Sequence, residues 1–376
     1  MHDIECVTRG DARRPAEEHR MKFGIAIPTA ADSWRLVRRA EELGFHHAWF
    51  FDTQMLSADP FVAMAAAAMK TGKIRLGTGV LIPSNRIAPA AANALASLNK
   101  LAPGRIDFGI STGFTGRRTM GLPAVKLADM AEYIRVVQAL WRGETVESEI
   151  EGKRRQIRFL SPELELINLK DPIPLYIAAT GPRARTLTAK LGAAWIDNVA
   201  DAERGAATLE QMRGVWAQAG RAPDALTAVA WIGGAVLEEG EPADGPRAMA
   251  LGGPRASMLL HRAADAALAG YPAPVAMLPE FTQAVEGYVA HARTFEPAGA
   301  YYLANHRGHL MYVRPDERPF ITADMIRKTS FVGTATDLIR RIGALRDAGF
   351  SQVVFSIPPG QEHAIEDWGR IRRAFG

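Results

Sequence analysis

Hydrophobic and polar positions alternate along this chain in a repeating order of short apolar runs and amphipathic stretches. Between the runs, apolar residues recur at 3- and 4-residue spacing, as in Leu36, Val37, Ala40 and Leu43, and this spacing predicts helices. The runs themselves are almost continuously apolar, which is typical of parallel strands covered on both faces. The predicted strands are Phe23–Pro28, Ala48–Asp52, Ile74–Ile82, Ile106–Ser111, Leu175–Ala179, Ala194–Asn198, Leu226–Leu237 and Gln352–Ile357.

The two ends of the chain carry a similar helix–glycine–strand unit. The segment LVRRAEELGF, residues 36–45, resembles LIRRIGALRDAGF, residues 338–350, and each leads into an aromatic-rich strand. Gly44 and Gly349 stand where a left-handed residue would end each helix. A unit repeated at both ends suits a closed barrel, so we predict an α/β fold, a (β/α)₈ TIM barrel. On the pattern alone, a doubly wound open sheet is the alternative.

Two stretches depart from simple strand–helix alternation. Residues 145–160 predict a β-hairpin that turns near Glu151–Gly152. Residues 238–329 predict an insertion between strands seven and eight, which would cover the C-terminal face of the barrel as a lid and form a wall for the substrate. This stretch combines residues that interrupt regular structure, such as Gly252–Gly253–Pro254, with the large side chains of Tyr301, Tyr302 and Tyr312, so we expect a mobile lid. Residues 1–20 are expected to be a disordered extension, and residues 21–376 the fold.

Composition narrows the class of protein. Hydrophobic residues make up 48% of the chain and charged residues 23%, so a large core is expected. The net charge of +4 is spread rather than clustered and does not point to nucleic acid. The only cysteine is Cys6, no apolar run approaches the ~20 residues of a membrane span, and the N-terminal segment is too charged for a signal peptide. We therefore expect a cytoplasmic protein that acts on a small molecule.

The candidate chemistry lies after the strands, where barrel enzymes place their active sites. The strand ends read FDTQM, GTGVLIP, STGFTG, AATGPR and DNVA, and three of them combine glycine with threonine or serine. Thr180, Gly181 and Pro182 open a predicted helix whose N-terminus could bind a phosphate, with Arg183 beside it. An ordinary turn with proline at the first helical position is the alternative for this segment.

The usual signatures of protein-based catalysis are missing from the sequence. It has no GxSxG elbow, no HExxH motif, no Walker loop and no GxGxxG fingerprint. Among nine histidines only His306 and His309 have a spacing compatible with ligands, and one i, i+3 pair is weak, so no metal is predicted. The reactivity is therefore expected to come from an organic cofactor.

A family resemblance adds to this picture. The sequence from about residue 21 onward resembles the luciferase-like family, and within it the deazaflavin-dependent methylenetetrahydromethanopterin reductase branch. The motifs that carry the resemblance occur in order along the chain, and they are MKFGIAIP, GFHHAWFFDTQ, IRLGTGV, LAPGRIDFGISTG, IAATGPRARTLTAKLG and SFVGTATDLIRR. The resemblance implies the same barrel fold and a flavin or deazaflavin cofactor.

The resemblance also implies site residues. Relatives have a non-prolyl cis peptide in a bulge after strand three, and Gly79–Val80 matches it. Asp52 matches a carboxylate after strand two, although from the residues alone it could cap the next turn. Positions that match the phosphate site of relatives are Thr112, Gly113, Thr180, Gly181, Pro182 and Arg183.

At three positions this chain departs from its relatives, so the substrates of those relatives are not predicted for this protein. The reductase branch has acids where this chain has Ala26 and Phe114, and the sugar-phosphate dehydrogenases have a histidine where it has Thr53. Phe114 favours an apolar or aromatic substrate, unless it only packs under the lid. Arg117 is expected to line the substrate side. Asp52 and His309 are expected on the substrate side too, as catalytic groups. His309 lies in a turn of the lid, where a near-neutral pKa would suit proton transfer, although it could equally be an exposed loop residue.

These features together predict an oxidoreductase that transfers hydride at the barrel mouth with coenzyme F420 or FMN. The alternative is an FMN-dependent two-component monooxygenase, which would need a flavin reductase as partner; a non-catalytic flavin-binding protein is the remote one. We expect a homodimer, with no nucleic-acid or membrane partner.

Overall fold

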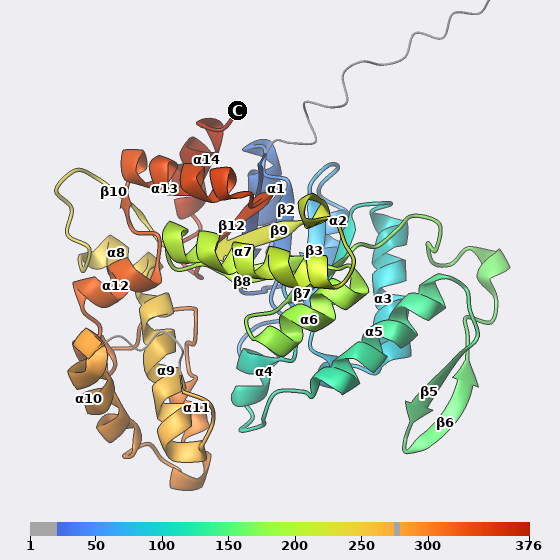
Figure 1. Cartoon of the computed structure of the whole chain (residues 1–376), viewed down its shortest axis with the longest axis horizontal. Coiled ribbons are helices and arrows are strands. Elements are labelled where there is room, and N and C mark those ends of the chain that lie inside the picture. Colours follow the sequence, from blue (N-terminus) through green and yellow to red (C-terminus); the bar gives the residue numbers. More distant parts are fainter. Residues whose placement is uncertain (1–20, 274–278) are drawn as a thin grey trace, which may run out of the picture.

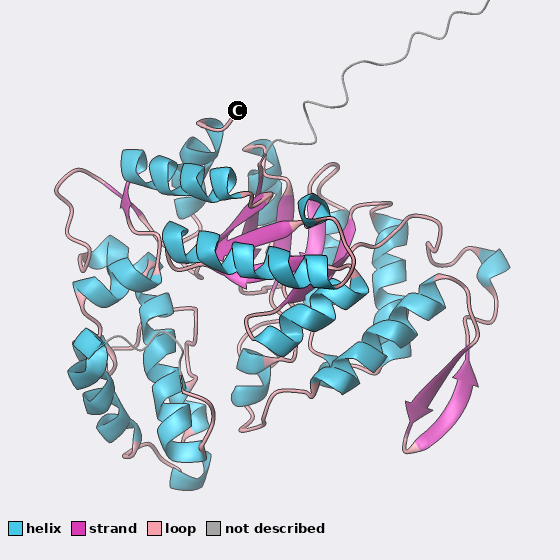
Figure 2. Cartoon of the chain, in the orientation of Figure 1, coloured by secondary structure: helices cyan, strands magenta, loops and turns pink. Residues whose placement is uncertain are grey.

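Parallel strands form the centre of the molecule in a computed structural model that describes residues 21–273 and 279–376 (Figures 1 and 2). The expected extension, residues 1–20, lies outside the described residues. Within them, eight strands close into a barrel in the order β1-β12-β9-β8-β7-β4-β3-β2. The barrel strands are β1 (Lys22–Ile27), β2 (His47–Phe50), β3 (Arg75–Thr78), β4 (Ile106–Ile110), β7 (Leu175–Ala178), β8 (Ala194–Asn198), β9 (Ala228–Ile232) and β12 (Gln352–Ser356).

Closure of the sheet excludes the open-sheet alternative. β1 pairs with β2 on one side and with β12 on the other, with Lys22 opposite Gln352. Every predicted strand is present, most end within two residues of the prediction, and two end well before it. β3 ends at Thr78 because the chain bulges at Gly79–Val80, and Leu81 rejoins β4 only through an isolated bridge to Ile110.

The predicted strand 226–237 is also divided. Gly233 and Gly234 separate β9 from a two-residue strand, β10 (Val236–Leu237), where the backbone of Phe331 approaches closely. A Cβ atom at Gly234 would lie 1.9 Å from the Phe331 carbonyl oxygen, so only glycine fits there. An apolar run that contains two glycines therefore predicts the strand but not its end.

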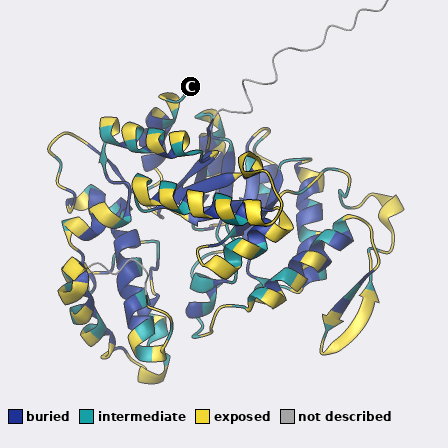
Figure 3. Cartoon of the chain, viewed as in Figure 1, coloured by how far each residue is buried: buried dark blue, intermediate teal, exposed yellow. Residues whose placement is uncertain are grey.

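Helices surround the barrel with their buried faces turned toward it and their exposed faces outward (Figure 3). Both helices of the repeated terminal unit are followed by a left-handed glycine, with φ +82° at Gly44 and +108° at Gly349, as predicted. The helices of this layer are α1 (Trp34–Glu42), α2 (Pro60–Ala68), α3 (Ala88–Leu101), α4 (Phe114–Arg118), α5 (Leu127–Trp141), α6 (Pro182–Leu191), α7 (Ala202–Gln218), α13 (Ala335–Ala348) and α14 (Ala364–Arg373).

The insertion between the seventh and eighth barrel strands is helical and lies to one side of the barrel (Figure 1). Its two ends meet where β10 pairs in parallel with β11 (Gly333–Thr334), so the segment leaves and re-enters the barrel at one place. Its helices are α8 (Pro246–Leu251), α9 (Gly253–Ala269), α10 (Thr282–Ala292), α11 (Tyr302–Asn305) and α12 (Ala323–Thr329).

One expectation about the insertion is wrong. Gly252–Gly253–Pro254 is not a flexible loop, because all three residues are buried and the last two begin α9. At Gly253 a Cβ atom would lie 2.6 Å from the Val313 side chain, so these glycines permit close packing. The rest of the insertion that the structure describes has its own buried centre around Leu260, Val285 and Tyr288.

The predicted hairpin is confirmed as β5 (Val146–Ile150) and β6 (Lys153–Ile157), with left-handed Glu151 and Gly152 at the turn. It projects from the side of the barrel that faces away from the insertion (Figure 2). Among the described helices, none combines the length and the apolar character needed to cross a lipid bilayer.

Candidate active site

An aromatic floor fills the barrel below its C-terminal mouth. Because side chains alternate along a strand, every second residue points inward, and these residues form one buried cluster. Trp49 and Trp231 dominate it, with ring centroids 6.1 Å apart, and Phe51 lies 6.1 Å from Trp231. The Trp231 indole N–H donates to the Ser356 hydroxyl at 3.1 Å. The cluster is Ala26, Trp49, Tyr176, Ile196, Val229, Trp231 and Val354, with Phe51, Val80, Ala178 and Ala194 packed against it.

The bulge after β3 lies directly against this floor. The Gly79–Val80 peptide is cis, which confirms the sequence prediction. Gly79 donates its N–H to the Phe50 carbonyl, and a Cβ atom at Gly79 would lie 2.8 Å from both Trp231 Cη2 and Trp49 Cβ. The bulge therefore approaches the two tryptophans as closely as only glycine allows, and it presents the half-buried Val80 at the mouth.

The residues predicted to bind phosphate come together at the rim of the mouth. β4 and β7 are neighbours, and the Ser111 hydroxyl, just past β4, donates to the Ala178 carbonyl at 3.1 Å. This brings the loop of Thr112 and the left-handed Gly113 beside the start of α6.

The start of α6 is open to solvent. Thr180, Gly181, Pro182 and Arg183 are all exposed, with Pro182 at the first helical position. Within the described part of the chain, no partner of the Arg183 guanidinium is found. The first N–H groups of a helix have no intrahelical acceptor, so this end can receive an anion.

Asp52 lies near the mouth, but its carboxylate is fully engaged. Its side chain is 1% exposed, and both oxygens accept from Arg86 Nη1 at 3.0 and 3.1 Å. Oδ2 also accepts the Ile82 N–H at 3.1 Å. The expectation that Asp52 lines the substrate side is therefore corrected, because its buried carboxylate anchors the loop after β3; its catalytic role stays a prediction.

Of two adjacent arginines on α4, the structure turns Arg118 rather than Arg117 toward the insertion. Arg117 Nε donates to the Pro123 carbonyl and braces its own loop, and its place on the substrate side stays a prediction. Arg118 is buried and lies 3.8 Å from Asp265 of α9, and its Nε and Nη1 have no hydrogen-bond partner among residues 21–273 and 279–376. The sequence did not single out Arg118. Adjacent residues of a helix point in different directions, and nothing in the motif shows which of the two arginines points toward the insertion.

Phe114 joins α4 to the insertion. Its half-buried ring lies under the guanidinium groups of Arg118 at 5.3 Å and of Arg262, on α9, at 5.1 Å. Arg118 also lines a cavity of about 330 Å³ between the segment after α4 and the insertion. The lining of this cavity includes Arg118, Gly121, Asp265, Tyr271, Tyr301 and Tyr302. The insertion therefore provides most of the wall of this cavity, and Arg118 lies between the cavity and the Phe114 ring.

His309 is neither exposed nor at the mouth-facing surface of the insertion. It is 1% exposed, and its Nδ1 lies 2.7 Å from His261 Nδ1. Burial lowers the pKa of His309 well below its ordinary value, and His261 adds to this effect. The expectation of a near-neutral pKa for proton transfer is wrong, because a buried imidazolium would be poorly solvated.

Asp197, at the end of β8, is a buried carboxylate that sequence reasoning did not single out. Burial raises its pKa to about 6, which Arg185 and Arg255 oppose. Arg255 comes from α9 and is itself buried, with Nη2 3.4 Å from the Trp231 carbonyl oxygen. This arginine ties the insertion to the end of β9. The only sign of Asp197 in the sequence is the acid in the strand-end segment DNVA.

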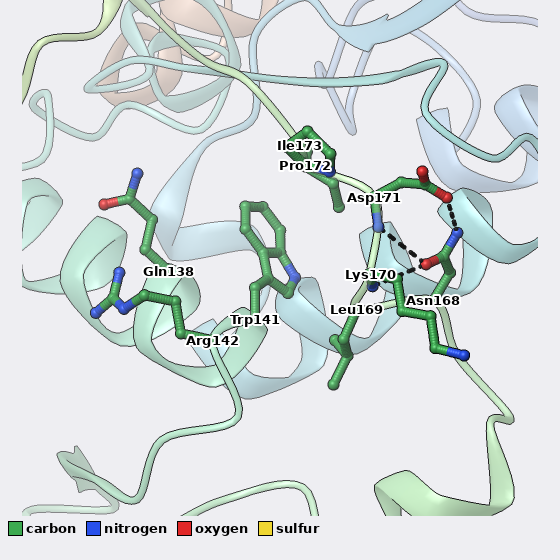
Figure 4. Close-up of a pocket in the computed structure, with 9 residues that line it drawn as sticks. All are labelled: Gln138, Trp141, Arg142, Asn168, Leu169, Lys170, Asp171, Pro172 and Ile173. Carbon is green, nitrogen blue, oxygen red and sulfur yellow. Dashed lines mark hydrogen bonds between the residues drawn. The ribbon is translucent and has the colours of Figure 1, made fainter. Parts of the chain in front are cut away.

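The hollow in Figure 4, of about 400 Å³, lies away from the mouth. It is lined by Trp141, at the end of α5, and by the loop that leads into the amino end of β7. In that loop the Asn168 side chain bonds Asp171 and the Lys170 N–H, so it closes its own turn. We assign this hollow no part in the site.

The structure is a closed parallel barrel with an apolar mouth and an open helix N-terminus at its rim, an arrangement suited to binding an organic cofactor. Comparison with known proteins identifies the family. Residues 4–352 match the model of the luciferase-like monooxygenases, so the chain belongs to that family, as the sequence motifs indicated. The protein is an enzyme of this family.

Relatives in the family carry related activities. The chain is 27% identical over 354 residues to the 5,10-methylenetetrahydromethanopterin reductase of Archaeoglobus fulgidus, covering 91% of this chain and 95% of that protein. It is 36% identical over 141 residues to the F420-dependent glucose-6-phosphate dehydrogenase of Beutenbergia cavernae, but this match covers only 35% of the chain and 40% of that enzyme.

Among solved structures, the coenzyme F420-dependent tetrahydromethanopterin reductase of Methanopyrus kandleri superposes with a TM-score of 0.67. It is 21% identical and covers 95% of this chain and 100% of its own. This likeness confirms the barrel fold.

Proposed function

We propose that this protein is an oxidoreductase that transfers hydride at the barrel mouth with coenzyme F420 or FMN. One observation carries the proposal: an apolar floor of Phe51, Val80 and Trp231 lies at the mouth where α6 opens its N-terminus to solvent. A flat ring system that bears a phosphate group fits this pairing of surfaces.

Each part of the cofactor would have its own residues. Val80 and Trp231 would support the ring, while the Gly181 and Arg183 amides, the Arg183 guanidinium and the Thr112 loop would hold the phosphate. Pro182 fixes the first turn of α6 without using an N–H group. When bound, such a cofactor supplies a site that accepts or donates hydride. The chain itself binds and orients the reactants and excludes water.

The relatives favour coenzyme F420 over FMN. The A. fulgidus and B. cavernae enzymes are, by name, a methylenetetrahydromethanopterin reductase and an F420-dependent dehydrogenase. The description of the family as monooxygenases supports the second candidate, an FMN-dependent two-component monooxygenase. That candidate would require reduced FMN from a flavin reductase, and it would consume oxygen.

The proposed substrate is small and apolar or aromatic. Phe114 and the tyrosines of the 330 Å³ cavity offer flat apolar surface, and the unpartnered N–H groups of Arg118 offer a donor for one acceptor oxygen. Position 26 in the barrel is alanine and position 114 on α4 is phenylalanine, so neither of these two positions supplies an acid. Recognition at this mouth therefore depends on shape and on one or two hydrogen bonds, with the insertion acting as a lid.

Arg183→Ala tests the phosphate site directly. Loss of one charged hydrogen bond should weaken cofactor binding by about 1.5–3 kcal/mol, roughly 10- to 150-fold in Kd. The matched control is Lys190→Ala, which removes an exposed cation from the last turn of the same helix.

Fluorescence titration with coenzyme F420 and with FMN gives the affinity, and oxygen uptake with reduced FMN separates the two candidate activities. We expect tighter binding of coenzyme F420 and no oxygen uptake. Binding of neither cofactor to the wild-type protein would refute the proposed function. An unchanged affinity in Arg183→Ala would move the phosphate site elsewhere.

A further inference from the structure

Three buried histidines meet in the centre of the insertion, apart from the residues proposed to hold the cofactor. His261 lies on α9, His306 follows α11, and His309 lies in the next turn. Each is at most 1% exposed, and each offers a ring nitrogen within 4.8 Å of the nitrogens of the other two. His309 is 48 residues from His261 in sequence, so only the fold brings the three together.

The outer nitrogens of two of these rings face carboxylates. His261 Nε2 lies 2.9 Å from Glu317 Oε2, and His306 Nε2 lies 3.1 Å from Asp265 Oδ1. A carboxylate on one ring nitrogen fixes the tautomer and leaves the lone pair on the other nitrogen. In both residues the nitrogen left over is Nδ1, so the carboxylates orient the two rings as they orient histidines that bind metals.

The inner nitrogens lack the partners that buried polar atoms normally have. His306 Nδ1 and His309 Nε2 are buried and form no hydrogen bond within the described residues. His261 Nδ1 and His309 Nδ1 face each other at 2.7 Å, and one proton at most can serve that contact. Leaving a buried acceptor unsatisfied is costly. A shared electrophile would take the Nδ1 lone pairs of His261 and His306 and one ring nitrogen of His309 at once.

We propose that His261, His306 and His309 bind one divalent transition-metal ion, with Zn²⁺ the first candidate. Three imidazole nitrogens with an open fourth position are a common zinc arrangement, and nitrogen ligands disfavour Mg²⁺ and Ca²⁺. Nitrogens of a tetrahedral zinc lie roughly 3.3 Å apart for Zn–N bonds of about 2.0 Å. The three ligand nitrogens all lie within 4.8 Å of one another, and the His261 and His309 Nδ1 atoms are only 2.7 Å apart, so binding an ion requires small shifts of the side chains.

The surroundings show which parts of the insertion this ion would hold together. Asp265 Oδ1 also accepts from the Tyr301 hydroxyl and the Asn305 amide, and Arg314 pairs with Glu317 at 3.0 Å. A metal held by the three rings would clamp α9 to segment 302–309 and hold Asp265 opposite Arg118. The site reverses the sequence-based expectation of no metal, and it does not depend on the proposed oxidoreductase activity.

The test uses the full chain without an affinity tag. Metal content is measured by mass spectrometry as purified, after chelation, and after incubation with Zn²⁺ or, as a control, Mg²⁺. We expect about one Zn²⁺ per chain, and a melting temperature that Zn²⁺ but not Mg²⁺ raises in the chelated protein. No bound Zn²⁺ after incubation with excess ion would overturn the proposal.

Variants locate the ion. His309→Ala should lose stoichiometric zinc, whereas His363→Ala, which removes an exposed histidine before α14, should retain it. Glu317→Gln keeps the three rings and should weaken zinc binding roughly 10- to 100-fold through the orientation of His261. Equal zinc content in His309→Ala and His363→Ala would overturn the site.

Cobalt provides a readout that needs no variant to fold. Co²⁺ bound in a tetrahedral nitrogen site gives strong visible absorption bands, and we expect these bands in the wild-type protein after chelation and Co²⁺ addition. Zn²⁺ should displace them. A weak spectrum of octahedral type, or none at all, would contradict three imidazole ligands.

Discussion

Asp52→Asn separates a positioning role from a catalytic one. In the wild-type protein both carboxylate oxygens accept from Arg86, and one also accepts the Ile82 N–H. Asparagine keeps one acceptor oxygen but loses the charge, and its amide group would face a guanidinium. The loop after β3 would therefore lose its main anchor while the shape of the side chain is preserved.

The expected loss of stability follows from burial. Removing one partner of a fully buried ion pair costs about 3–5 kcal/mol. Arg86 is less isolated than that, because its side chain is 19% exposed and it also pairs with Asp59. We therefore expect the free energy of unfolding to fall by about 2–3 kcal/mol.

Urea unfolding followed by tryptophan fluorescence provides the measurement, since Trp49 and Trp231 report on the barrel interior. The control is Asp32→Asn, which removes an exposed acid whose pairing distance with Arg35 is 4.0 Å, and it should change stability by less than about 0.5 kcal/mol. If Asp52→Asn were as stable as the wild type but had no turnover, the positioning role would be wrong and the catalytic assignment would be supported.

Three further predictions concern other parts of the structure. Asp197 has a pKa of about 6, above the ordinary 3.8, so its contribution to stability is present at low pH and is lost as pH rises through 6. Between pH 4 and pH 7 the free energy of unfolding of the wild type should therefore fall by up to about 3 kcal/mol relative to that of Asp197→Asn. The same pH dependence in both proteins, measured by urea unfolding, would contradict this. Gly79→Ala should cost about 1–3 kcal/mol through overpacking against Trp231, and an unaltered near-ultraviolet circular dichroism spectrum would argue against it. Hydrogen exchange in residues 238–329 should slow when cofactor and substrate bind, whereas identical rates with and without ligands would exclude a lid.

Much of the fold could be predicted because it depends on local sequence patterns. Apolar runs gave the strands, and the glycines at 44 and 349 gave the ends of two helices. The cis peptide at Gly79–Val80 was predicted from a family motif rather than from the residues themselves. The ends of β3 and β9 were missed because backbone packing against Trp49 and Phe331, not local pattern, breaks these strands.

The site was harder to predict because its chemistry depends on partners far away in sequence. The motif that contains Asp52 does not show that Arg86 neutralises it. His309 was expected to be a proton-transfer group because it lies in a turn of the insertion, and only tertiary packing places it in the interior beside His261. Residue type and spacing predicted where the rim would be, but burial decided which polar groups remain free there.

The closed ring of strands has a consequence for how this protein is made. Lys22 and Gln352 are partners in the sheet, so β1 keeps one unpaired edge until β12 has been synthesised. At roughly 5–20 residues per second this interval lasts on the order of tens of seconds. An unpaired apolar strand is a template for wrong pairing, and contacts between distant segments form slowly. The folded barrel has no exposed strand edge, but during synthesis the incomplete barrel has one for most of this interval. We expect chaperones to be needed most during that interval.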